Sequence, residues 1–288
     1  MDLNTVLDWA RQKIGSSSDS AALDAELLLA HCIGKSRSYL YTWPEQALSD
    51  EHWETYQSLI AQRLIPTPVA YLLGEREFFS LDFKTTPAAL IPRSDTELLV
   101  EAALKLCPNH SNFSILELGT GTGAIAITLK LHRPSYTVIA TDISPQCLEL
   151  AKQNATRHEV DINWRLSDWF NAVETSERYD MIVSNPPYIA QNDVYLTRGD
   201  LPAEPLLALS SGPTGLESLQ HIITSALDYL KPGGHLLLEH GYDQEFAVAN
   251  LLKSGGFTNI SCQYDINNLP RLSIGQCVST ESHQVTHC

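Results

Sequence analysis

The sequence predicts an α/β fold, in which a mainly parallel sheet has helices on both faces and follows a small helical bundle. Three features of the chain lead to this prediction. Apolar residues recur at helical spacing over the first 73 residues. After residue 96, strand-like and helix-like segments alternate, which is typical of βαβ crossovers. Finally, 43% of the 288 residues are apolar and only 18% are charged, so the chain can bury a full core.

Residues 1–74 are predicted to form a helical domain. The apolar positions fall three or four residues apart, at Leu3, Val6, Leu7, Ala10 and Ile14, at Leu23, Leu27, Leu28 and Ala30, and at Trp53, Tyr56, Ile60 and Leu64. Asp19-Ser20 and Ser49-Asp50 can cap helix N-termini, while Gly34 and Gly74 can end helices. This spacing predicts a bundle in which several short helices share one apolar core.

Residues 75–278 are predicted to form the second domain. Aromatic and polar residues alternate over 75–92, which predicts a hairpin or extended linker. Strands are expected at 114–118, 136–141, 162–166, 179–184, 235–239, 259–264 and 272–278. Helices are expected near 95–106, after 123, after 145, near 216–230 and near 244–253. The polar segment 279–288 is predicted to be a disordered tail.

The charge and the motif content exclude several classes of protein. A formal charge of -15 with only 19 Lys and Arg argues against direct binding to duplex DNA, which draws its free energy from phosphate contacts. The six cysteines form no CxxC pair, and the ten histidines form no HExxH or zinc spacing, so neither a disulfide framework nor a metal site is expected. Neither a signal peptide nor an apolar run of roughly 20 residues is evident. We therefore expect a cytoplasmic protein without a membrane anchor.

A glycine-rich loop follows the strand expected at 114–118 and precedes a helix. It reads Gly119, Thr120, Gly121, Thr122 and Gly123, and its glycines allow close approach of a ligand to the backbone. The next strand ends at Asp142, whose carboxylate can bind both hydroxyls of a ribose. The loop lacks the third glycine of a dinucleotide site, and Glu117 just before it suits a cationic ligand. We therefore expect S-adenosyl-L-methionine as the cofactor, the alternative being a glycine turn that binds nothing.

Two further segments follow strands at the same sheet edge. In the first, SDWF (167–170), Asp168 is expected to accept a hydrogen bond from the adenine amine, and Trp169 is expected to pack on the adenine ring. The alternative is that Trp169 is a core residue.

The second segment, SNPPYIA, follows the strand at 179–184. Asn185 Oδ1 and the Pro186 carbonyl can accept the two N–H bonds of a planar amide, and the prolines hold these acceptors rigidly. Pro187 and Tyr188 complete the predicted substrate clamp, in which Tyr188 packs against the planar group. We therefore predict that Asn185, Pro186 and Tyr188 carry catalysis by positioning, with no general base. The alternative is a rigid turn without a role.

These motifs resemble the HemK/PrmC family of protein-(glutamine-N5) methyltransferases. The resemblance runs over most of the chain, through YLLGEREFFSLDF, LIPRSDTELLVE, ILELGTGTGAIAI, SDWF, MIVSNPPYIA, GGHLLLEHG and RLSIG. It implies a Rossmann-like class I methyltransferase with a seven-stranded sheet, and a helical N-terminal domain that docks the substrate. The substrate it implies is the Gly-Gly-Gln glutamine of class 1 peptide chain release factors.

The resemblance also assigns roles to individual residues. It implies that the glycine loop holds the methionine part of the cofactor, Asp142 the ribose and Trp169 the adenine side. Asn185 to Tyr188 would hold the glutamine, and Asn185 is also predicted to contact the cofactor. The chain departs from the family pattern at Ser94 and at 202–205, where the family shows a proline and an Arg-aromatic pair before Glu-Pro.

The sequence leaves several alternative functions open. Related enzymes methylate a glutamine of a ribosomal protein, and NPPY also occurs in adenine-N6 nucleic-acid methyltransferases, although the acidic chain speaks against the latter. A scaffold that binds the cofactor without catalysis is a third reading. Glu97 either lies in the first turn of a helix or faces the positive end of the cofactor.

Overall fold

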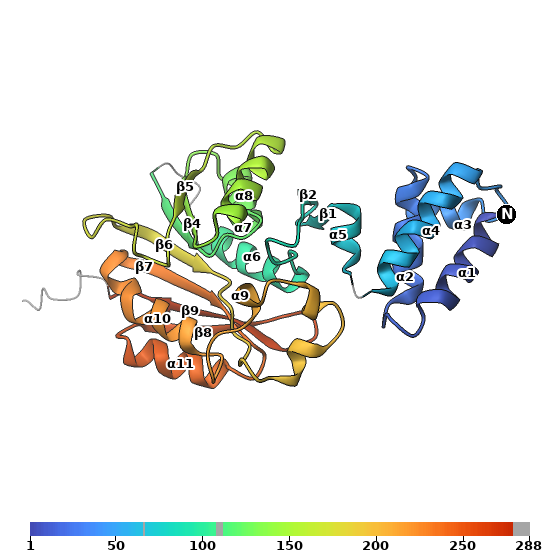
Figure 1. The fold of residues 1–288 in the computed structure, drawn as a ribbon. Coiled ribbons are helices and arrows are strands. Elements are labelled where there is room, and N and C mark those ends of the chain that lie inside the picture. Colours follow the sequence, from blue (N-terminus) through green and yellow to red (C-terminus); the bar gives the residue numbers. More distant parts are fainter. Residues whose placement is uncertain (66, 108–111, 279–288) are drawn as a thin grey trace, which may run out of the picture.

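The computed structural model describes residues 1–65, 67–107 and 112–278. Figure 1 shows a group of N-terminal helices set apart from a larger α/β body, with a small hairpin between them. Among the described residues, no helix combines the length and the apolar character that a membrane span requires. The predicted disordered tail, residues 279–288, lies outside the described residues.

Among the described residues up to 74, the structure has five helices: α1 (Leu3–Ile14), α2 (Ala21–Cys32), α3 (Arg37–Thr42), α4 (Asp50–Leu64) and α5 (Val69–Leu73). They enclose a separate core, which contains most of the apolar residues singled out from the sequence. Tyr56 is fully buried there and donates a hydrogen bond to the Ala25 carbonyl at 2.9 Å. Trp9 and Trp53 pack edge to face across α1 and α4, with ring centroids 4.7 Å apart.

The caps of these helices agree only in part with the sequence prediction. Ser49 caps α4, and Gly74 ends α5 with a φ of 74°. Ser20 precedes α2 but makes no capping hydrogen bond, and its hydroxyl donates to the Asp24 carboxylate at 2.8 Å. Asp2, which the sequence analysis did not single out, caps α1 through the Thr5 N–H.

The predicted hairpin is confirmed as β1 (Glu75–Phe78) and β2 (Leu81–Lys84). Its two-residue turn, Phe79-Ser80, has positive φ at both positions, which matches the twist of the paired strands. Phe78 and Phe83 are buried, and the Lys84 backbone forms two hydrogen bonds with the Asn154 side chain. The hairpin is thus fixed to the α/β body.

The α/β body is built on a seven-stranded sheet in the order β5-β4-β3-β6-β7-β9-β8. The strands are β3 (Ser114–Leu118), β4 (Thr137–Asp142), β5 (Asn163–Leu166), β6 (Tyr179–Ser184), β7 (Leu230–Glu239), β8 (Thr258–Tyr264) and β9 (Pro270–Gln276). The first five in this order are parallel, and β9 is antiparallel to both of its neighbours. The mostly parallel sheet is therefore confirmed.

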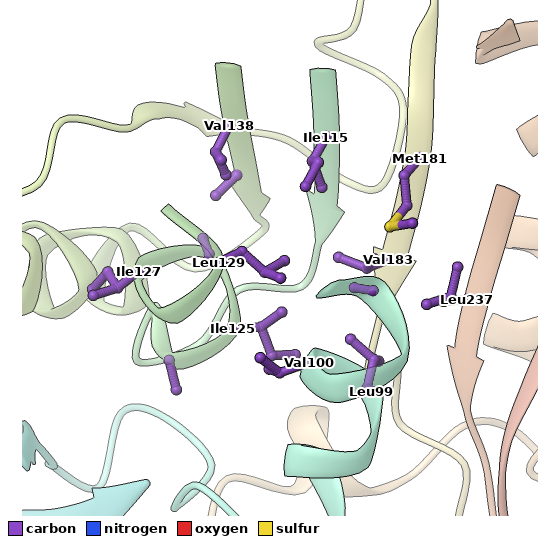
Figure 2. Close-up of a cluster of buried hydrophobic side chains, with 14 of the residues drawn as sticks. Leu99, Val100, Ile115, Ile125, Ile127, Leu129, Val138, Met181, Val183 and Leu237 are labelled. Atoms are coloured by element: carbon purple, nitrogen blue, oxygen red, sulfur yellow. The ribbon is translucent and has the colours of Figure 1, made fainter. Parts of the chain in front are cut away.

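Helices cover both faces of the sheet (Figure 1). One face packs against α6 (Glu97–Leu106) and α7 (Ala124–His132), with α8 (Pro145–Arg157) alongside, and Figure 2 shows the apolar side chains that meet there. The other face packs against α10 (Glu217–Ala226) and α11 (Glu245–Ser254). Short helices η1 (Ser94–Thr96), η2 (Val194–Thr197), η3 (Leu201–Ala203), α9 (Leu206–Leu209) and η4 (Leu227–Tyr229) complete the fold.

One strand begins earlier than predicted. The sequence predicts a helix to about residue 230 and a strand from His235, but α10 ends at Ala226 and β7 begins at Leu230. Leu230 pairs with Tyr179, and the Lys231 ammonium binds the Asp180 carboxylate at 2.6 Å. The register with β6 shifts between Tyr179 and Met181, so the Pro-Gly-Gly segment lies in an irregularity between the paired residues Leu230 and His235.

Candidate active site

A cavity of about 400 Å³ lies at the carboxyl ends of β3, β4 and β6. The chain runs from β3 to β4 and β5 on one side and returns to β6 on the other, and such a switch point is where open α/β sheets bind ligands. The predicted site residues that line it are Gly119, Thr120, Gly121, Thr122, Asp142, Asp168, Trp169, Asn185 and Pro187. Gly123, Pro186 and Tyr188 are not among the described residues that line it.

The glycine loop is fixed to the strand beside it. The Thr120 N–H donates to the Thr141 carbonyl at 2.9 Å, and the Gly121 N–H donates to Asp142 Oδ2 at 2.8 Å. Gly121 has a φ of 56°, and a Cβ built on it would meet nothing within 4 Å, so the backbone there faces open space. Gly123 closes the turn instead, because a Cβ there would lie 3.0 Å from the Ile127 side chain. The loop therefore presents bare backbone to the cavity.

Asp142 organises the loop and faces the cavity at the same time. Its Oδ1 accepts from the Ser144 N–H at 2.8 Å, while Oδ2 accepts from Gly121. Burial raises the pKa of this carboxyl above its ordinary value, and the backbone N–H bonds oppose that rise. Each carboxylate oxygen has a lone pair left for a ligand hydroxyl.

Glu117 does not face the cavity, so the expectation that it meets a cationic ligand is wrong. Its carboxyl is buried beneath the loop, where Oε2 accepts from the Thr120 hydroxyl at 2.7 Å and from the Ala126 N–H at 3.1 Å. Burial raises the pKa of Glu117 to about 8. Because side chains alternate along a strand, Glu117 points toward α7 and not toward the ligand edge.

Glu97 lies in the first turn of α6, as one of the two readings predicts. Its Oε1 accepts a hydrogen bond from the Phe79 N–H at 2.9 Å, so it joins the helix to the hairpin turn.

The segment that contains Asp168 and Trp169 forms a tight turn at the end of β5. The Ser167 hydroxyl donates to the Trp169 carbonyl at 2.8 Å and accepts from the Ala172 N–H at 2.9 Å. Trp169 has a φ of 49°, and its ring lies 3.8 Å from where a Cβ on Gly119 would be. The ring thus packs on the glycine loop as well as on the core. Asp168 is exposed at the rim.

SNPPY begins where β6 ends beside β3. Ser184 pairs with Leu118 in the sheet and donates its hydroxyl to the Leu118 carbonyl at 2.7 Å, which brings Asn185 next to the glycine loop. The Asn185 side chain donates through Nδ2 to the Thr96 hydroxyl at 3.0 Å. Within the described residues, Asn185 Oδ1 and the Pro186 carbonyl accept no hydrogen bond. Asn185 lines the cavity, so its oxygen is free for a ligand there, whereas Pro186 is buried and is not among the described residues that line it.

Comparisons with known proteins agree with this arrangement. Residues 5–74 match a family described as PrmC N-terminal domain, and residues 94–199 match the Methyltransferase small domain. Release factor glutamine methyltransferases of Shewanella oneidensis and Vibrio cholerae are 45% and 44% identical to the chain. The first alignment covers 94% of both chains, and the second covers 91% of both. The chain belongs to the release factor glutamine methyltransferase family.

Solved structures support the fold of this methyltransferase. The catalytic domain of hMettl16 superposes with a TM-score of 0.57 at 16% identity, covering 77% of this chain and 83% of that one. A methyltransferase from Pyrococcus furiosus has a TM-score of 0.53 at 18% identity, covering 77% and 98%. At these identities the likeness establishes the shared Rossmann-like class I architecture and nothing about the substrate.

Several residues of the methyltransferase site were not found from its sequence. Thr96 binds the predicted Asn185 amide and lines the cavity. Glu239, at the end of β7, accepts a hydrogen bond from the Tyr188 hydroxyl at 3.3 Å. Both lie in motifs that were noted, LIPRSDTELLVE and GGHLLLEHG, but their partners are 89 and 51 positions away.

The loop after SNPPY is fixed by a buried acid. Glu204 binds the Arg93 guanidinium and accepts from the Ile91 N–H at 3.1 Å. Ile189 pairs with the segment at Ser210, and Gln244 donates to the Tyr188 carbonyl at 2.9 Å. The departure at 202–205 therefore retains an acid that anchors the loop at the cavity mouth.

Proposed function

We propose that the protein transfers a methyl group from S-adenosyl-L-methionine to the side-chain amide nitrogen (N5) of the glutamine in the Gly-Gly-Gln motif of class 1 release factors. The observation that carries this proposal is the Asn185 amide, whose Nδ2 is held by Thr96 and whose Oδ1 is left free beside the glycine loop. An acceptor fixed in this way can orient the N–H of a second amide.

The residues of the cavity suit the cofactor. Bare backbone at Gly119 and Gly121 can lie against the methionine part, while Asp142 has lone pairs for two ribose hydroxyls. Trp169 offers a ring face, and Asp168 offers an exposed acceptor beside it for the adenine amine. Bound there, S-adenosyl-L-methionine supplies an electrophilic methyl carbon on a positively charged sulfur.

The chain contributes by positioning. An amide nitrogen is a poor nucleophile, so its alignment decides the rate, and such alignment can supply roughly 7 to 11 kcal/mol. We assign Asn185 Oδ1 and the Pro186 carbonyl as acceptors for the two N–H groups, while Pro187 stiffens the corner. When the N–C bond forms and the C–S bond breaks, the nitrogen becomes acidic and loses one proton to solvent, so no general base is needed.

Tyr188 supports this clamp from beneath. Its hydroxyl donates to buried Glu239 and its carbonyl accepts from Gln244, so its ring is fixed. We assign it to the floor against which the planar amide packs.

We also propose that residues 1–74 form the domain that docks the release factor. Its core is separate from that of residues 75–278, and Arg63 of α4 binds Asp200 of the active-site loop at 2.8 Å. A release factor docked on these helices would therefore lie next to the cavity. Because release factors work on ribosomes, we place the protein in the cytoplasm.

The test is transfer of label from methyl-labelled cofactor to a purified class 1 release factor. We expect label on the wild-type factor, and none when the Gly-Gly-Gln glutamine is replaced by alanine. Label that persists after this replacement would contradict the proposed acceptor. Parallel reactions with ribosomal protein and with duplex DNA test the alternatives, of which the DNA alternative is opposed by the charge of -15.

A further inference from the structure

Glu239 is a buried acid directly behind the clamp. Its side chain lies at the end of β7, with 2% of the residue exposed, and it is not among the described residues that line the cavity. Oε1 accepts from the Tyr188 hydroxyl at 3.3 Å, and the Thr96 hydroxyl lies close enough to the carboxyl to lower its pKa. Within the described residues Glu239 forms no salt bridge, and its buried Oε2 has no hydrogen-bond partner.

Thr96 joins this acid to the catalytic amide. A hydroxyl has one hydrogen to donate and accepts through its lone pairs. If that hydrogen is donated to Glu239, the Thr96 oxygen is left as an acceptor, and its partner on Asn185 must be the Nδ2 group. Asn185 Oδ1 must then be the atom that remains free.

A flipped Asn185 amide would defeat catalysis. It would direct N–H groups at the N–H groups of the substrate amide, and two donors facing each other cannot bond. An ionised carboxylate excludes this orientation because it can only accept, so the hydroxyls of Thr96 and Tyr188 must both donate toward it.

We propose that Glu239 is a positioning residue, which acts through Thr96 to hold the Asn185 amide with its oxygen toward the substrate. This inference rests on the proposed function, and it assigns to the site an acid that touches neither substrate nor cofactor. A glutamine at this position would keep the shape of Glu239, but it could donate to Thr96 and so release the constraint.

Protonation of Glu239 should have an effect similar to that of the Glu239→Gln substitution, because a protonated carboxyl can also donate to Thr96. Burial raises the pKa of Glu239 to about 7, so this group changes its charge near neutral pH. The titratable and charged groups that face it are Tyr188 after β6, Asp95 of η1 and Arg271 of β9. The next residue, His240, has a pKa lowered by burial, and its Nε2 forms a hydrogen bond with the Ser273 hydroxyl. The rate of transfer should therefore rise as pH rises through the pKa of Glu239.

The experiment compares Glu239→Gln, Asn185→Asp and the double variant in methyl transfer to the release factor. Glu239→Gln should lower kcat by about tenfold or more at pH 8, because a donor replaces the acceptor that fixes the amide. Its cofactor affinity, measured by calorimetry, should stay within about twofold of wild type, since Glu239 lies outside the cavity. Its kcat should also lose the rise with pH.

The double variant tests directly which end of the residue 185 side chain faces Thr96. The carboxylate introduced by Asn185→Asp accepts in either orientation. The amide introduced by Glu239→Gln can donate to Thr96, and the Thr96 hydroxyl is then able to donate to the new carboxylate. The double variant should therefore be at least about fivefold more active than the product of the two single effects predicts. A multiplicative result, or a Glu239→Gln enzyme with unchanged kcat, would overturn the inference.

A second route covers the case in which Glu239→Gln does not fold. Thr96→Val removes the connecting hydroxyl and should abolish the rise of kcat with pH, whereas Thr96→Ser should retain it. A rise that survives in Thr96→Val would also overturn the inference. If wild type fails to methylate the release factor at all, the proposed function fails instead, so the two failures are distinguishable.

Discussion

Asp142→Ala is expected to weaken cofactor binding far more than it weakens the fold. The Asp142 carboxylate accepts two backbone N–H bonds at 2.8 Å and has lone pairs for two ribose hydroxyls. A hydrogen bond to a charged group contributes about 1.5–3 kcal/mol, so two such bonds amount to about 3–6 kcal/mol. The dissociation constant of the cofactor should therefore rise by roughly 10²- to 10⁴-fold.

The assay is isothermal titration calorimetry with S-adenosyl-L-methionine, together with thermal unfolding without ligand. Burial raises the pKa of Asp142, so removing its charge relieves part of a desolvation cost and offsets the loss of the two loop contacts. Asp168→Ala is the matched control, because that acid is exposed and is assigned one contact, so its loss should be under about tenfold. An Asp142→Ala enzyme with wild-type affinity would refute the ribose assignment.

Three further predictions concern the clamp, the buried ion pair of the helical domain and the buried acid beneath the glycine loop. Asn185→Ala should lower kcat by about 10²-fold while cofactor affinity changes by only a few-fold, and equal turnover would contradict the clamp. Arg63→Met leaves buried Asp24 without its cation, although the Ser18 and Ser20 hydroxyls still donate to the carboxylate, and should cost about 3–5 kcal/mol in urea unfolding. Arg157→Met, in an exposed pair, should cost under about 1 kcal/mol. The raised Glu117 pKa, about 8 against an ordinary 4.5, stabilises the fold at low pH, and this contribution is lost as pH rises toward 8. Glu117→Gln should flatten that fall, and an unchanged pH profile of unfolding would show that the group is ionised in the fold.

Much of the fold was predictable from the sequence because local patterns decide it. The strands at 114–118 and 179–184 have the predicted bounds, since each is an apolar run that ends at a motif. The start of β7 was not predictable, because Leu230 and Lys231 are held by Tyr179 and Asp180 of a distant strand.

The site was predictable where one segment contains the whole pattern, as in the glycine loop and SNPPY. It was not predictable where the chemistry depends on contacts between segments. Thr96 and Glu239 act on Asn185 and Tyr188 from 89 and 51 positions away. The prediction for Glu117 was wrong because a position next to the loop in the sequence does not show on which face of the strand the side chain lies.

The most direct test of the account is a crystal structure with S-adenosylhomocysteine and a peptide that contains Gly-Gly-Gln. We expect the glutamine side chain in the cavity, its nitrogen turned toward the sulfur and its N–H groups on Asn185 Oδ1 and the Pro186 carbonyl. A glutamine bound away from the Asn-Pro-Pro-Tyr corner, or a cofactor bound away from the glycine loop, would contradict it.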